Sequence, residues 1–481
     1  MRRVVLLFAV VGAAVLLATG VALAQQERTT AAEDSPSFKG PDGKKFASNK
    51  LIVKLRDGAT TEDLRRINSR NGASIDKEDL APNLVPDLHR VSLPSTLGAQ
   101  QAVGRYEAFK DVVEYAEVDY IQYANKVAND PYSTNGSLWG LNKIQAPAAW
   151  DSITGKNVGG ATTYNSPLVA VIDEGVQIGH SDFKDATDTD GDADNIWTNY
   201  DEVGKTSGVD DSPNSNYSKI DDFNGWDENQ NNNSVYDGTS DDHGTHVADT
   251  IGARGNNNTG VTGVNWHTDI AVCKFLGPAG GYTSDAIACL DYVVFELGAR
   301  VSNNSWGGGG YSQGLLDAIK RARDWGHIFV VAAGNGGSDS VGDDNDSKPS
   351  YPSSYNVDDP NDPNDWDNII AVASTTSTDA KSGFSNYGLK SVDLGAPGSG
   401  IYSTVPGRKN ASSYASYSGT SMATPHVTGT VALIWAKDPK LTARQVKDLI
   451  LQNVDGITSL DGKTVSGGRL NAFKAVQNAG P

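Results

Sequence analysis

A serine, a histidine and an aspartate stand in surroundings that could make the serine a nucleophile. Ser421 lies in Gly-Thr-Ser-Met-Ala-Thr-Pro-His at residues 419–426, where an apolar helical pattern begins. A serine hydroxyl attacks poorly until a neighbouring base accepts its proton. His243, which opens His-Gly-Thr-His-Val-Ala, can be that base, and Asp173, which follows the apolar run 168–172, can orient it. These residues predict nucleophilic catalysis by a Ser-His-Asp triad.

Each of these residues also has an alternative interpretation. Asp173 taken alone is more often a turn or capping residue. His246 lies three positions after His243, on nearly the same helix face, so the two could bind a metal. The zinc motif His-Glu-x-x-His is absent, however. An esterase of the α/β-hydrolase type needs Gly-x-Ser-x-Gly and a serine that precedes its histidine, and the chain has neither.

Strand and helix patterns alternate around these residues. The expected strands are 168–172, 270–276, 300–305, 328–333 and 369–373, and the expected helices are 243–251, 284–297, 312–325, 421–436 and 443–453. This alternation predicts an α/β fold with a mainly parallel sheet and helices on both faces. In such sheets the site lies beyond the carboxyl ends of the strands, where Asp173 and Asn335 are expected.

The chain order Asp, His, Ser matches the subtilisin arrangement and differs from the chymotrypsin and α/β-hydrolase orders. On these motifs the chain resembles the subtilisin-like serine proteases (subtilases) along nearly its whole length. The resemblance implies a serine endopeptidase that forms an acyl-enzyme on Ser421, and it makes His246 structural. A non-catalytic protein with this fold is the remaining alternative, but such proteins usually lose a triad member or the oxyanion asparagine. All four residues are present here.

The resemblance also implies how substrate binds. Asn335, in Val-Ala-Ala-Gly-Asn, resembles the side-chain donor of an oxyanion hole, whose second donor is the Ser421 backbone N–H. Substrate binds as an added strand. The expected substrate-binding residues are Ser305, Trp306, Gly307, Gly280, Gly281, Tyr282, Gly334 and Gly336. Trp306 is expected to wall the main pocket, although a lone aromatic is equally a core residue. Gly336 implies a roomy, uncharged pocket that favours Phe, Tyr, Leu or Met.

The formal net charge of −19 comes almost entirely from aspartates after residue 129. Such a surface disfavours nucleic acid as a partner. Loops rich in Asp, Asn and Gly suit Ca²⁺, which takes oxygen ligands, although acidic solubility is the alternative. The resemblance implies one tight Ca²⁺ site, and its expected ligands are Asp130, Asp182, Gly255, Asn257, Thr259 and Val261. Weaker candidates, which could equally be solvated acidic loops, are 188–194, 221–237 and 358–367.

The N-terminus predicts export. Arg2 and Arg3 precede an apolar run, and Ala22-Leu23-Ala24 forms a cleavage site, so residues 1–24 are interpreted as a signal peptide rather than as a membrane span. We expect a linker at 25–46, a small α+β ferredoxin-like domain at 47–125 and the catalytic domain at 129–481. The small domain's expected strands are 51–55, 88–93 and 112–121, and its helices are 61–69 and 99–110.

The position of the small domain resembles that of a subtilase pro-domain, although an unrelated ferredoxin-like module is the alternative. The resemblance implies an autoprocessed zymogen whose own pro-domain is chaperone and intramolecular inhibitor. Its mature start, Asn129-Asp130-Pro131-Tyr132, is similar to that of thermitase-like enzymes. We expect a secreted, extracellular monomer that acts on protein and peptide substrates and has no membrane contact once the signal peptide is removed.

The cysteines and three departures from the family pattern complete the sequence evidence. Cys273 and Cys289 form a disulfide if their predicted strand and helix pack together, and otherwise they are two buried thiols. Asp249 stands where the family usually has Gly, and Glu174 where Thr or Ser follows the catalytic Asp. Ser181 replaces a frequent Pro. Asp249 indicates that its helix packs, or tunes His243, in an unusual way.

Overall fold

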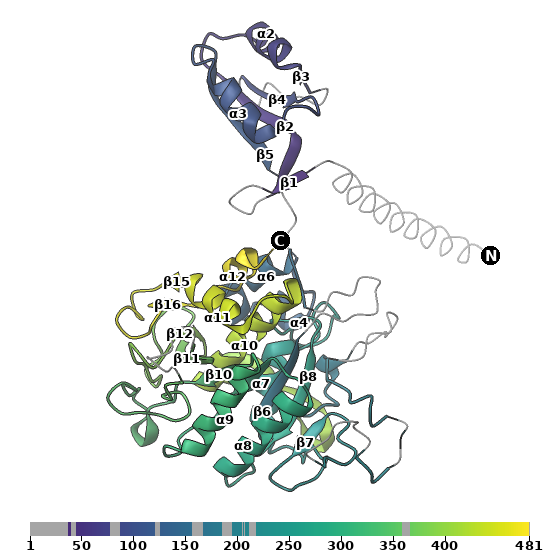
Figure 1. The fold of residues 1–481 in the computed structure, drawn as a ribbon, viewed down its shortest axis with the longest axis vertical. Helices are drawn as coiled ribbons and strands as arrows, with labels where there is room; N and C mark the ends of the chain where they lie inside the picture. The colour runs from purple at the N-terminus through teal and green to yellow at the C-terminus, as the bar shows by residue number, and fades with distance from the viewer. Residues whose placement is uncertain are drawn as a thin grey trace, which may run out of the picture. The chain divides into compact units, whose positions relative to one another are not determined.

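The computed structural model describes residues 37–39, 45–76, 87–120, 126–155, 167–184, 195–203, 205, 207–210, 218–357 and 366–480. The chain divides into two compact units, Met1–Tyr123 and Ala124–Pro481 (Figure 1). The expected signal peptide, most of the expected linker, the calcium candidate at 188–194 and most of that at 358–367 lie outside the described residues. Among the helices that are described, none is long and apolar enough to cross a membrane.

The smaller unit is an antiparallel sheet with two helices. Its elements are β1 (Ser37–Lys39), β2 (Lys45–Leu55), α2 (Thr61–Asn71), β3 (Ser74–Ile75), β4 (Leu88–Ser92), α3 (Ala99–Glu107) and β5 (Val113–Tyr120). Strand β2 pairs with both β4 and β5, and β4 pairs with β3, which gives the order β5-β2-β4-β3. This βαββαβ arrangement is ferredoxin-like, as the sequence predicted. The sequence analysis missed the short strands β1 and β3, and its linker at 25–46 is wrong where β1 and the start of β2 pair with each other.

The larger unit is built on a nine-stranded sheet in the order β15-β16-β12-β11-β10-β9-β6-β8-β7. Its strands are β6 (Leu168–Asp173), β7 (Gly225–Asp227), β8 (Asp269–Lys274), β9 (Val301–Asn304), β10 (Ile328–Ala332), β11 (Ile369–Thr375), β12 (Leu394–Pro397), β15 (Asp455–Gly456) and β16 (Gly468–Arg469). All neighbours pair in parallel except β15 and β16. The five predicted strands are β11, β10, β9, β6 and β8, which are consecutive in this order, so the predicted mainly parallel sheet is confirmed.

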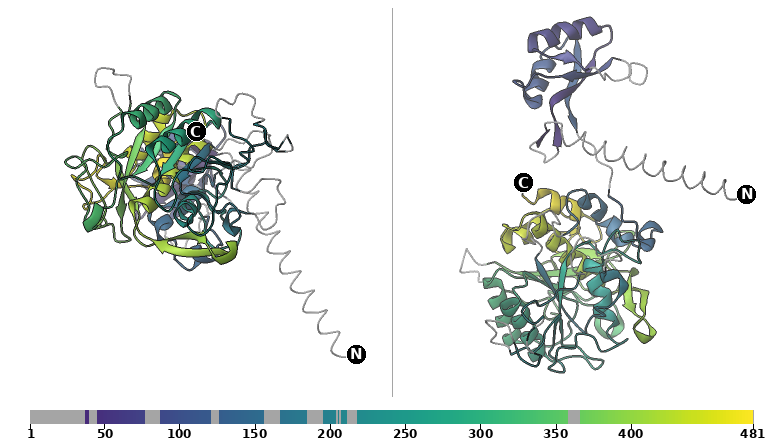
Figure 2. Two further views of the ribbon diagram at one scale, coloured as in Figure 1. Left: turned by 90° about the horizontal axis from the view of Figure 1, so that it is seen from below. Right: turned by 90° about the vertical axis from the view of Figure 1, so that its right-hand side faces the viewer.

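Helices cover both faces of this sheet because successive strand residues point to opposite sides. Val169 and Val171 of β6 pack in a core with α7 (Asp242–Gly252) and α10 (Thr420–Lys437), whereas Ala170 and Ile172 pack in a second core with α8 (Thr283–Asp291) and α9 (Gln313–Asp324). Figures 1 and 2 show α8 and α9 side by side on one face. Helices α11 (Ala443–Gln452) and α12 (Ala472–Asn478) pack against α10.

The remaining elements of the larger unit are short. They are α4 (Pro131–Thr134), α5 (Trp139–Lys143), α6 (Ala146–Trp150), η1 (Ser181–Phe183), η2 (Tyr292–Glu296), η3 (Gly337–Asp339), η4 (Arg408–Asn410) and the hairpin β13 (Ile401–Pro406) with β14 (Ser412–Tyr417).

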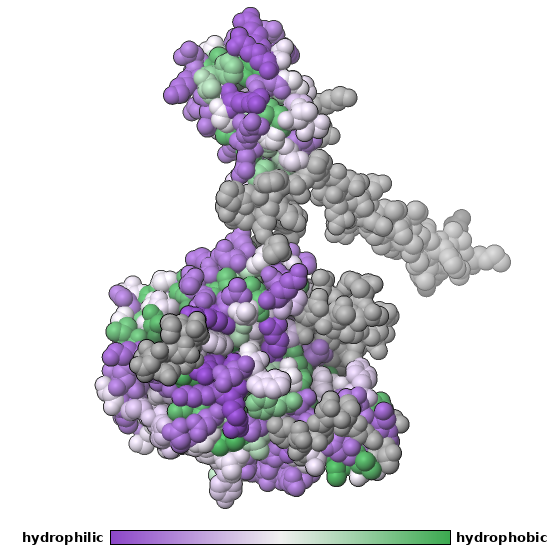
Figure 3. Space-filling view, in the orientation of Figure 1, coloured by the Kyte–Doolittle hydropathy of each residue, from purple (hydrophilic) through white to green (hydrophobic). Residues whose placement is uncertain are grey.

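Hydrophilic residues cover much of the face seen in Figure 3, where apolar residues lie in small separate groups.

The helix expected at 284–297 is not a single α-helix. It ends as α-helix at Asp291 and continues as the π-helical segment η2. The wider turn allows three successive residues, Tyr292, Val293 and Val294, to be buried, which one face of a regular helix does not permit. Tyr292 also donates its hydroxyl hydrogen to Asp222. Tertiary packing therefore overrides the local helical pattern here.

Helix α10 is the centre of the larger unit. Every residue from Met422 to Ala436 is buried, as expected of a helix that is apolar all round. Gly429 allows the close approach of the loop before β8, because a Cβ atom there would lie 2.6 Å from Val264 Cβ. Only the first and last turns of α10 reach the surface, so its N-terminal residues are held in a fixed position.

Cys273 of β8 and Cys289 of α8 form a disulfide, with Cα atoms 5.6 Å apart and a sequence separation of 16. The alternative of two free thiols is therefore wrong. Closing a loop of this length restricts the unfolded chain by about 3 kcal/mol in the chain-entropy model.

Replacing both cysteines by alanine should lower the free energy of unfolding of the larger unit by about 2–4 kcal/mol, because the loop constraint on the unfolded chain is lost. Guanidinium unfolding followed by tryptophan fluorescence measures the loss. Dithiothreitol should destabilise the parent protein and leave the double variant unchanged. Equal unfolding midpoints for parent and variant would contradict a stabilising role for the disulfide.

Candidate active site

Three loops at the carboxyl edge of the sheet bring the expected residues together. Strands β10, β9 and β6 are neighbours, and all run in parallel. Asn335 follows β10 closely, Ser305 comes directly after β9, and Asp173 is the last residue of β6. The carboxyl ends of parallel strands meet at one edge, so local sequence and sheet order together position these side chains.

Asp173 and His243 are in direct contact. The Asp173 carboxylate is fully buried, and its Oδ1 lies 2.8 Å from His243 Nδ1. The Glu174 backbone N–H donates to the same oxygen at 2.9 Å, which fixes the carboxylate. His243 stands in the first turn of α7 with 29% of its side chain exposed. Because Nδ1 is held by Asp173, Nε2 is the ring atom left to exchange a proton with a substrate or a nucleophile.

Ser421 is the second residue of α10, and it is tied to the strand edge. Its hydroxyl donates to the Ser305 carbonyl at 3.1 Å, and the Ser305 hydroxyl donates to the Ser421 carbonyl at 2.9 Å. No hydrogen bond joins Ser421 to His243 among the contacts of these two described residues. The structure thus brings Asp173 to His243 and leaves the Ser421 hydroxyl turned toward Ser305. Catalytic hydrogen bonds often form only once substrate is bound.

The Asn335 amide has a defined orientation. Thr420 donates both its backbone N–H and its hydroxyl hydrogen to Asn335 Oδ1, at 2.9 and 3.0 Å. Since a backbone N–H can only donate, the atom it meets must be the amide oxygen, and Nδ2 is directed elsewhere as a donor. The sequence analysis missed the anchoring role of Thr420, although it stands next to Ser421 in the same motif.

Two cavities lie along this edge. One, of about 480 Å³, is lined by Ser305, Trp306, Gly307, Gly334, Asn335 and Ser421 together with other residues. The other, of about 310 Å³, is lined by Gly280, Gly281 and apolar residues, and it shares Trp306 and 307–309 with the first. Trp306 also packs edge-on against Phe275, so it belongs to both wall and core.

Tyr282 and Gly336, two further expected substrate residues, line neither cavity. Tyr282 is 75% exposed. Gly336 has φ 73°, and a Cβ atom there would lie 2.2 Å from the Val341 carbonyl oxygen, so no larger side chain fits.

The alternative histidine, His246, is buried away from this arrangement. Its Nε2 lies 3.1 Å from the Ile401 carbonyl oxygen, and its ring stacks on Tyr417. Burial lowers the pKa of His246 to about 3, so it is neutral at ordinary pH. These contacts give it a packing role between α7 and the hairpin β13–β14.

Most of the expected calcium ligands gather at one place. Asp130 and Asp182 are both fully buried. Asp130 accepts backbone N–H groups of Asn256 and Asn257 at 2.8 and 3.3 Å, and Asp182 accepts that of Val261 at 2.9 Å. Burial and the charge of Asp130 raise the pKa of Asp182 to about 6.

The loop that carries the other expected calcium ligands is compact. Asn257 Oδ1 accepts the Thr259 N–H at 2.9 Å, and Gly255 lies against Trp266 with no room for a side chain. Two carboxylates beside a loop rich in amide and carbonyl oxygens fit a hard cation. In the weaker calcium candidate at 221–237, the Asp222 carboxylate accepts a hydrogen bond from the Asn199 side chain, and the Asp227 carboxylate accepts one from the Gln230 backbone N–H.

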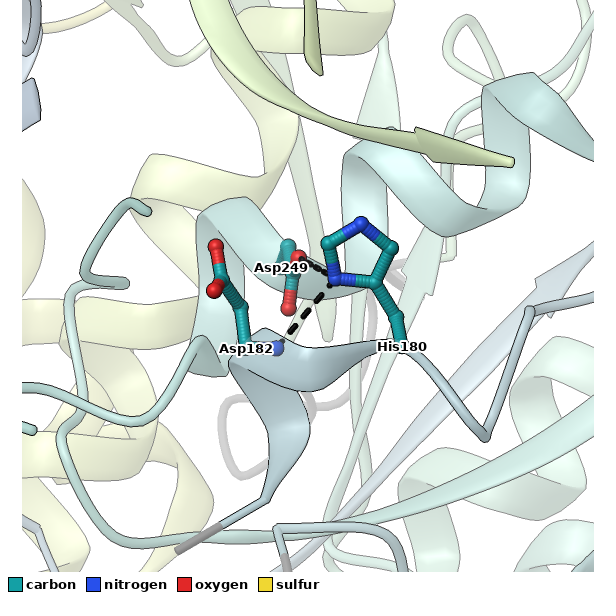
Figure 4. Close-up of side chains that lie close together, drawn as sticks. All are labelled: His180, Asp182 and Asp249. Atoms are coloured by element: carbon teal, nitrogen blue, oxygen red, sulfur yellow. Dashed lines mark hydrogen bonds and ion pairs between the residues drawn. The ribbon is translucent and has the colours of Figure 1, made fainter. Parts of the chain in front are cut away.

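Sequence reasoning missed one further cluster, in which His180, Asp182 and Asp249 are all buried and within reach of one metal ion (Figure 4). Asp182 was expected to bind calcium, and Asp249 was noted only as a departure from the family pattern. The unusual acidic residue at 249 was therefore the available signal.

Comparison with known proteins places the chain in a family. A profile described as the subtilase family matches residues 165–473, and one described as the fervidolysin N-terminal prodomain matches residues 32–119. Thermitase of Thermoactinomyces vulgaris is 35% identical over 349 residues, which cover 73% of this chain and 99% of thermitase. This chain belongs to the subtilase family.

Other relatives agree with this assignment. An extracellular protease of Xanthomonas campestris pv. campestris is 31% identical over 484 residues, covering 92% of the subtilase described here and 76% of that protein. Among solved structures, a protease of Pseudoalteromonas arctica has a TM-score of 0.55 at 26% identity and covers 74% of this subtilase and 100% of that chain. Fervidolysin of Fervidobacterium pennivorans has a TM-score of 0.53 at 24% identity, and the match covers 93% of this subtilase and 65% of fervidolysin. At this identity the likeness shows the fold alone. The subtilase is a serine endopeptidase with a fervidolysin-like prodomain.

Glu174 adds a second carboxylate beside the Asp173–His243 pair. Its Oε1 accepts the His243 backbone N–H at 2.6 Å. Burial, followed by the charge of Asp173, raises the pKa of Glu174 to about 7. Burial on its own lowers the pKa of His243, but Asp173, Glu174 and Asp242 stabilise the imidazolium and together raise it to about 9. The subtilase should therefore be most active at alkaline pH, where His243 is neutral.

Glu174→Gln should move the acid limb of kcat/KM to lower pH by about half a unit. The variant keeps an oxygen for the His243 N–H but loses a negative charge that is present above about pH 7 and that raises the pKa of His243. Half a unit corresponds to roughly 0.7 kcal/mol, a typical attraction between nearby charges in a wet cleft. The pH–rate profile measures the shift.

Asp461→Asn, which removes an exposed charge on another part of the surface, is the control and should leave the profile in place. An unchanged acid limb in Glu174→Gln, or one that moves to higher pH, would show that the Glu174 charge does not act on His243.

Proposed function

We propose that the subtilase hydrolyses peptide bonds with Asp173, His243 and Ser421 as its triad. The contact of 2.8 Å between Asp173 Oδ1 and His243 Nδ1 carries this proposal, because it orients a histidine as a base at the carboxyl edge of the sheet, where Ser421 lines a cavity. His243 Nε2 accepts the Ser421 proton as Oγ attacks the scissile carbonyl. The imidazolium, stabilised by Asp173, then donates that proton to the leaving amine, and water hydrolyses the acyl-enzyme by the same route.

The oxyanion that forms during attack needs donors that are already oriented. Asn335 Nδ2 is proposed as one donor, since Thr420 holds the amide oxygen on the other side. The backbone N–H of Ser421 is proposed as the second, in the first turn of α10, where helix amides are not used by the helix itself. The positive end of the α10 dipole favours the same negative charge.

The cavity beside Ser421 is proposed as the main specificity pocket. Its volume of about 480 Å³ suits a large side chain. The two charged residues that line it, Asp343 and Lys348, form an ion pair with each other at 2.8 Å, so the pocket offers no unpaired charge to a substrate. Large apolar residues such as Phe, Tyr, Leu and Met are therefore the preferred residues at the cleaved position.

Ser421→Ala should lower kcat for a chromogenic peptide with Phe at the cleaved position by about 10⁶-fold, which is the known loss for the nucleophilic serine of subtilisin, a member of the same family. A peptide with Glu at that position should be cleaved much more slowly than the Phe peptide by the parent enzyme. Steady-state kinetics measure both effects. Cleavage by Ser421→Ala at the parent rate would remove Ser421 from the mechanism.

The smaller unit is proposed to inhibit the catalytic unit until it is cut off near Asn129. The match to a fervidolysin-like prodomain and the separation of the chain into two compact units support this role. Secretion as a monomer is proposed from the expected signal peptide, and one relative is itself described as an extracellular protease. On a gel, the Ser421→Ala precursor should keep its full length while the parent shortens.

Calcium is proposed as a structural ion held by Asp130, Asp182, Asn257 and the backbone oxygens of Gly255, Thr259 and Val261. The two buried carboxylates support the proposal, because without a cation their charges repel each other. The ion would neutralise them and cross-link the mature N-terminus to η1 and the loop after α7. It takes no part in the proton transfers.

Removal of calcium with EGTA should lower the melting temperature of the catalytic unit, since a ligand at 100 times its Kd stabilises by about 2.7 kcal/mol. Asp130→Asn should reduce the response to added calcium, whereas the exposed control Asp461→Asn should respond as the parent does. Scanning calorimetry with and without calcium makes the comparison. An Asp130→Asn protein that calcium stabilises as strongly as the parent would remove Asp130 from the ligand set.

A further inference from the structure

Three side chains of types that can bind a metal lie close together near the segment that follows β6. His180 directly precedes η1, Asp182 is its second residue, and Asp249 lies in the C-terminal half of α7. All three are fully buried, and one possible ligand atom from each lies within 4.8 Å of those of the other two. Figure 4 shows the His180 ring and the Asp249 carboxylate facing each other, with Asp182 beside them.

Asp249 is the unusual member of this cluster. Both of its carboxylate oxygens are buried, and neither has a hydrogen-bond partner among the described residues. The Thr404 hydroxyl is the nearest donor and favours the ionised carboxylate, but it also donates to the Thr245 carbonyl oxygen at 3.4 Å, and burial and the charge of Asp182 still raise the pKa of Asp249 well above its usual value. A buried carboxylate without a donor or a cation is costly, because nothing replaces the water that it has lost. The carboxylate therefore points to a missing positive partner.

Both ring nitrogens of His180 contact backbone groups. Its Nε2 lies 3.1 Å from the Ser413 carbonyl oxygen and 3.2 Å from the Ser413 backbone nitrogen, and its Nδ1 accepts the Asp182 backbone N–H at 3.2 Å. In the tautomer that donates Nε2–H to the Ser413 carbonyl, His180 has the arrangement of metal-binding histidines, which usually donate their other N–H to a carbonyl or carboxylate. A metal ion at Nδ1 would replace the Asp182 N–H on the single lone pair of that nitrogen.

The spacing also fits an ion better than a direct contact. Nδ1 of His180 and Oδ2 of Asp249 lie 4.0 Å apart, which is too far for a hydrogen bond. Two ligand atoms that are each about 2.0–2.3 Å from a common ion lie roughly 3–4.5 Å apart. The Asp182 carboxylate accepts hydrogen bonds from the Val261 N–H and from the Tyr414 and Ser181 side chains, so a metal ion would take a remaining lone pair or replace one of these donors.

We propose that His180, Asp182 and Asp249 form a site for a divalent transition-metal ion of the zinc class. One imidazole nitrogen with two carboxylates suits such an ion, whereas calcium prefers oxygen alone. With calcium also bound, the carboxylates of Asp130, Asp182 and Asp249 offset three of the four positive charges, and His180 supplies a neutral ligand. Asp182 is shared with the proposed calcium ligands, while His180 and Asp249 belong to this site only. The ion links η1 to α7, the helix that carries His243.

The test uses the full-length chain with Ser421→Ala, which prevents self-digestion, stripped with EDTA and then saturated with calcium. Zinc chloride is added, unbound metal is removed by gel filtration, and metal content is measured by mass spectrometry. One zinc per chain is expected beyond the calcium. Asp249→Asn and His180→Gln should bind zinc more than about 100-fold more weakly, since loss of an outer partner alone costs about 10–100-fold.

A matched control and a second measurement separate a metal site from a merely protonated carboxyl group. Asp393→Asn changes a buried carboxylate outside the cluster and should keep the parent zinc content. Zinc should raise the melting temperature of the parent and not that of Asp249→Asn, which keeps the shape of the side chain without its charge. A parent protein that neither retains zinc nor gains thermal stability from it overturns the site, as does an Asp249→Asn protein with the parent's zinc affinity.

Discussion

The burial of α10 is the constraint on which the active site depends. Its residues from Met422 to Ala436 are all buried, the threonines and His426 among them because they bond backbone oxygens, and Gly429 lies against the loop before β8. Its first turn then emerges at the carboxyl edge of β9 and β10. Ser421 and Ser305 lock that end by exchanging hydrogen bonds. The position of the Ser421 hydroxyl is thus set by the packing of the buried run from Met422 to Ala436.

Sequence patterns were sufficient to predict the alternating strands and helices of the larger unit. The five predicted strands and the helices between them are apolar runs with clear periods, and parallel pairing then brings Asp173, Ser305 and Asn335 to one edge. The short strands β7, β12, β15 and β16 have too few residues for a pattern. The π-helical turn at Tyr292 depends on what surrounds it, and the Cys273–Cys289 pairing required a distance that only the fold supplies.

Two acidic residues near α7 show why a residue type alone does not predict a role. Glu174 meets the first turn of the helix, where an unused N–H and the positive end of the dipole receive its charge. Asp249 lies in the same helix but deep inside the protein, where no donor meets it among the described residues. Both departures from the family pattern were visible in the sequence. The difference between a carboxylate that accepts a backbone N–H and a buried one without a donor among the described residues appears only when the neighbours are known.

The backbone at Gly336 limits how the specificity of such an enzyme can be redesigned. Gly336 lines neither cavity, and a side chain there would collide with the Val341 carbonyl and would have to adopt a left-handed conformation, so the position is closed to substitution. Gly309, which lines the cavity beside Ser421, is exposed, has no positive φ, and has open space around its Cβ position. A library aimed at smaller substrate side chains has its most permissive starting point at this glycine.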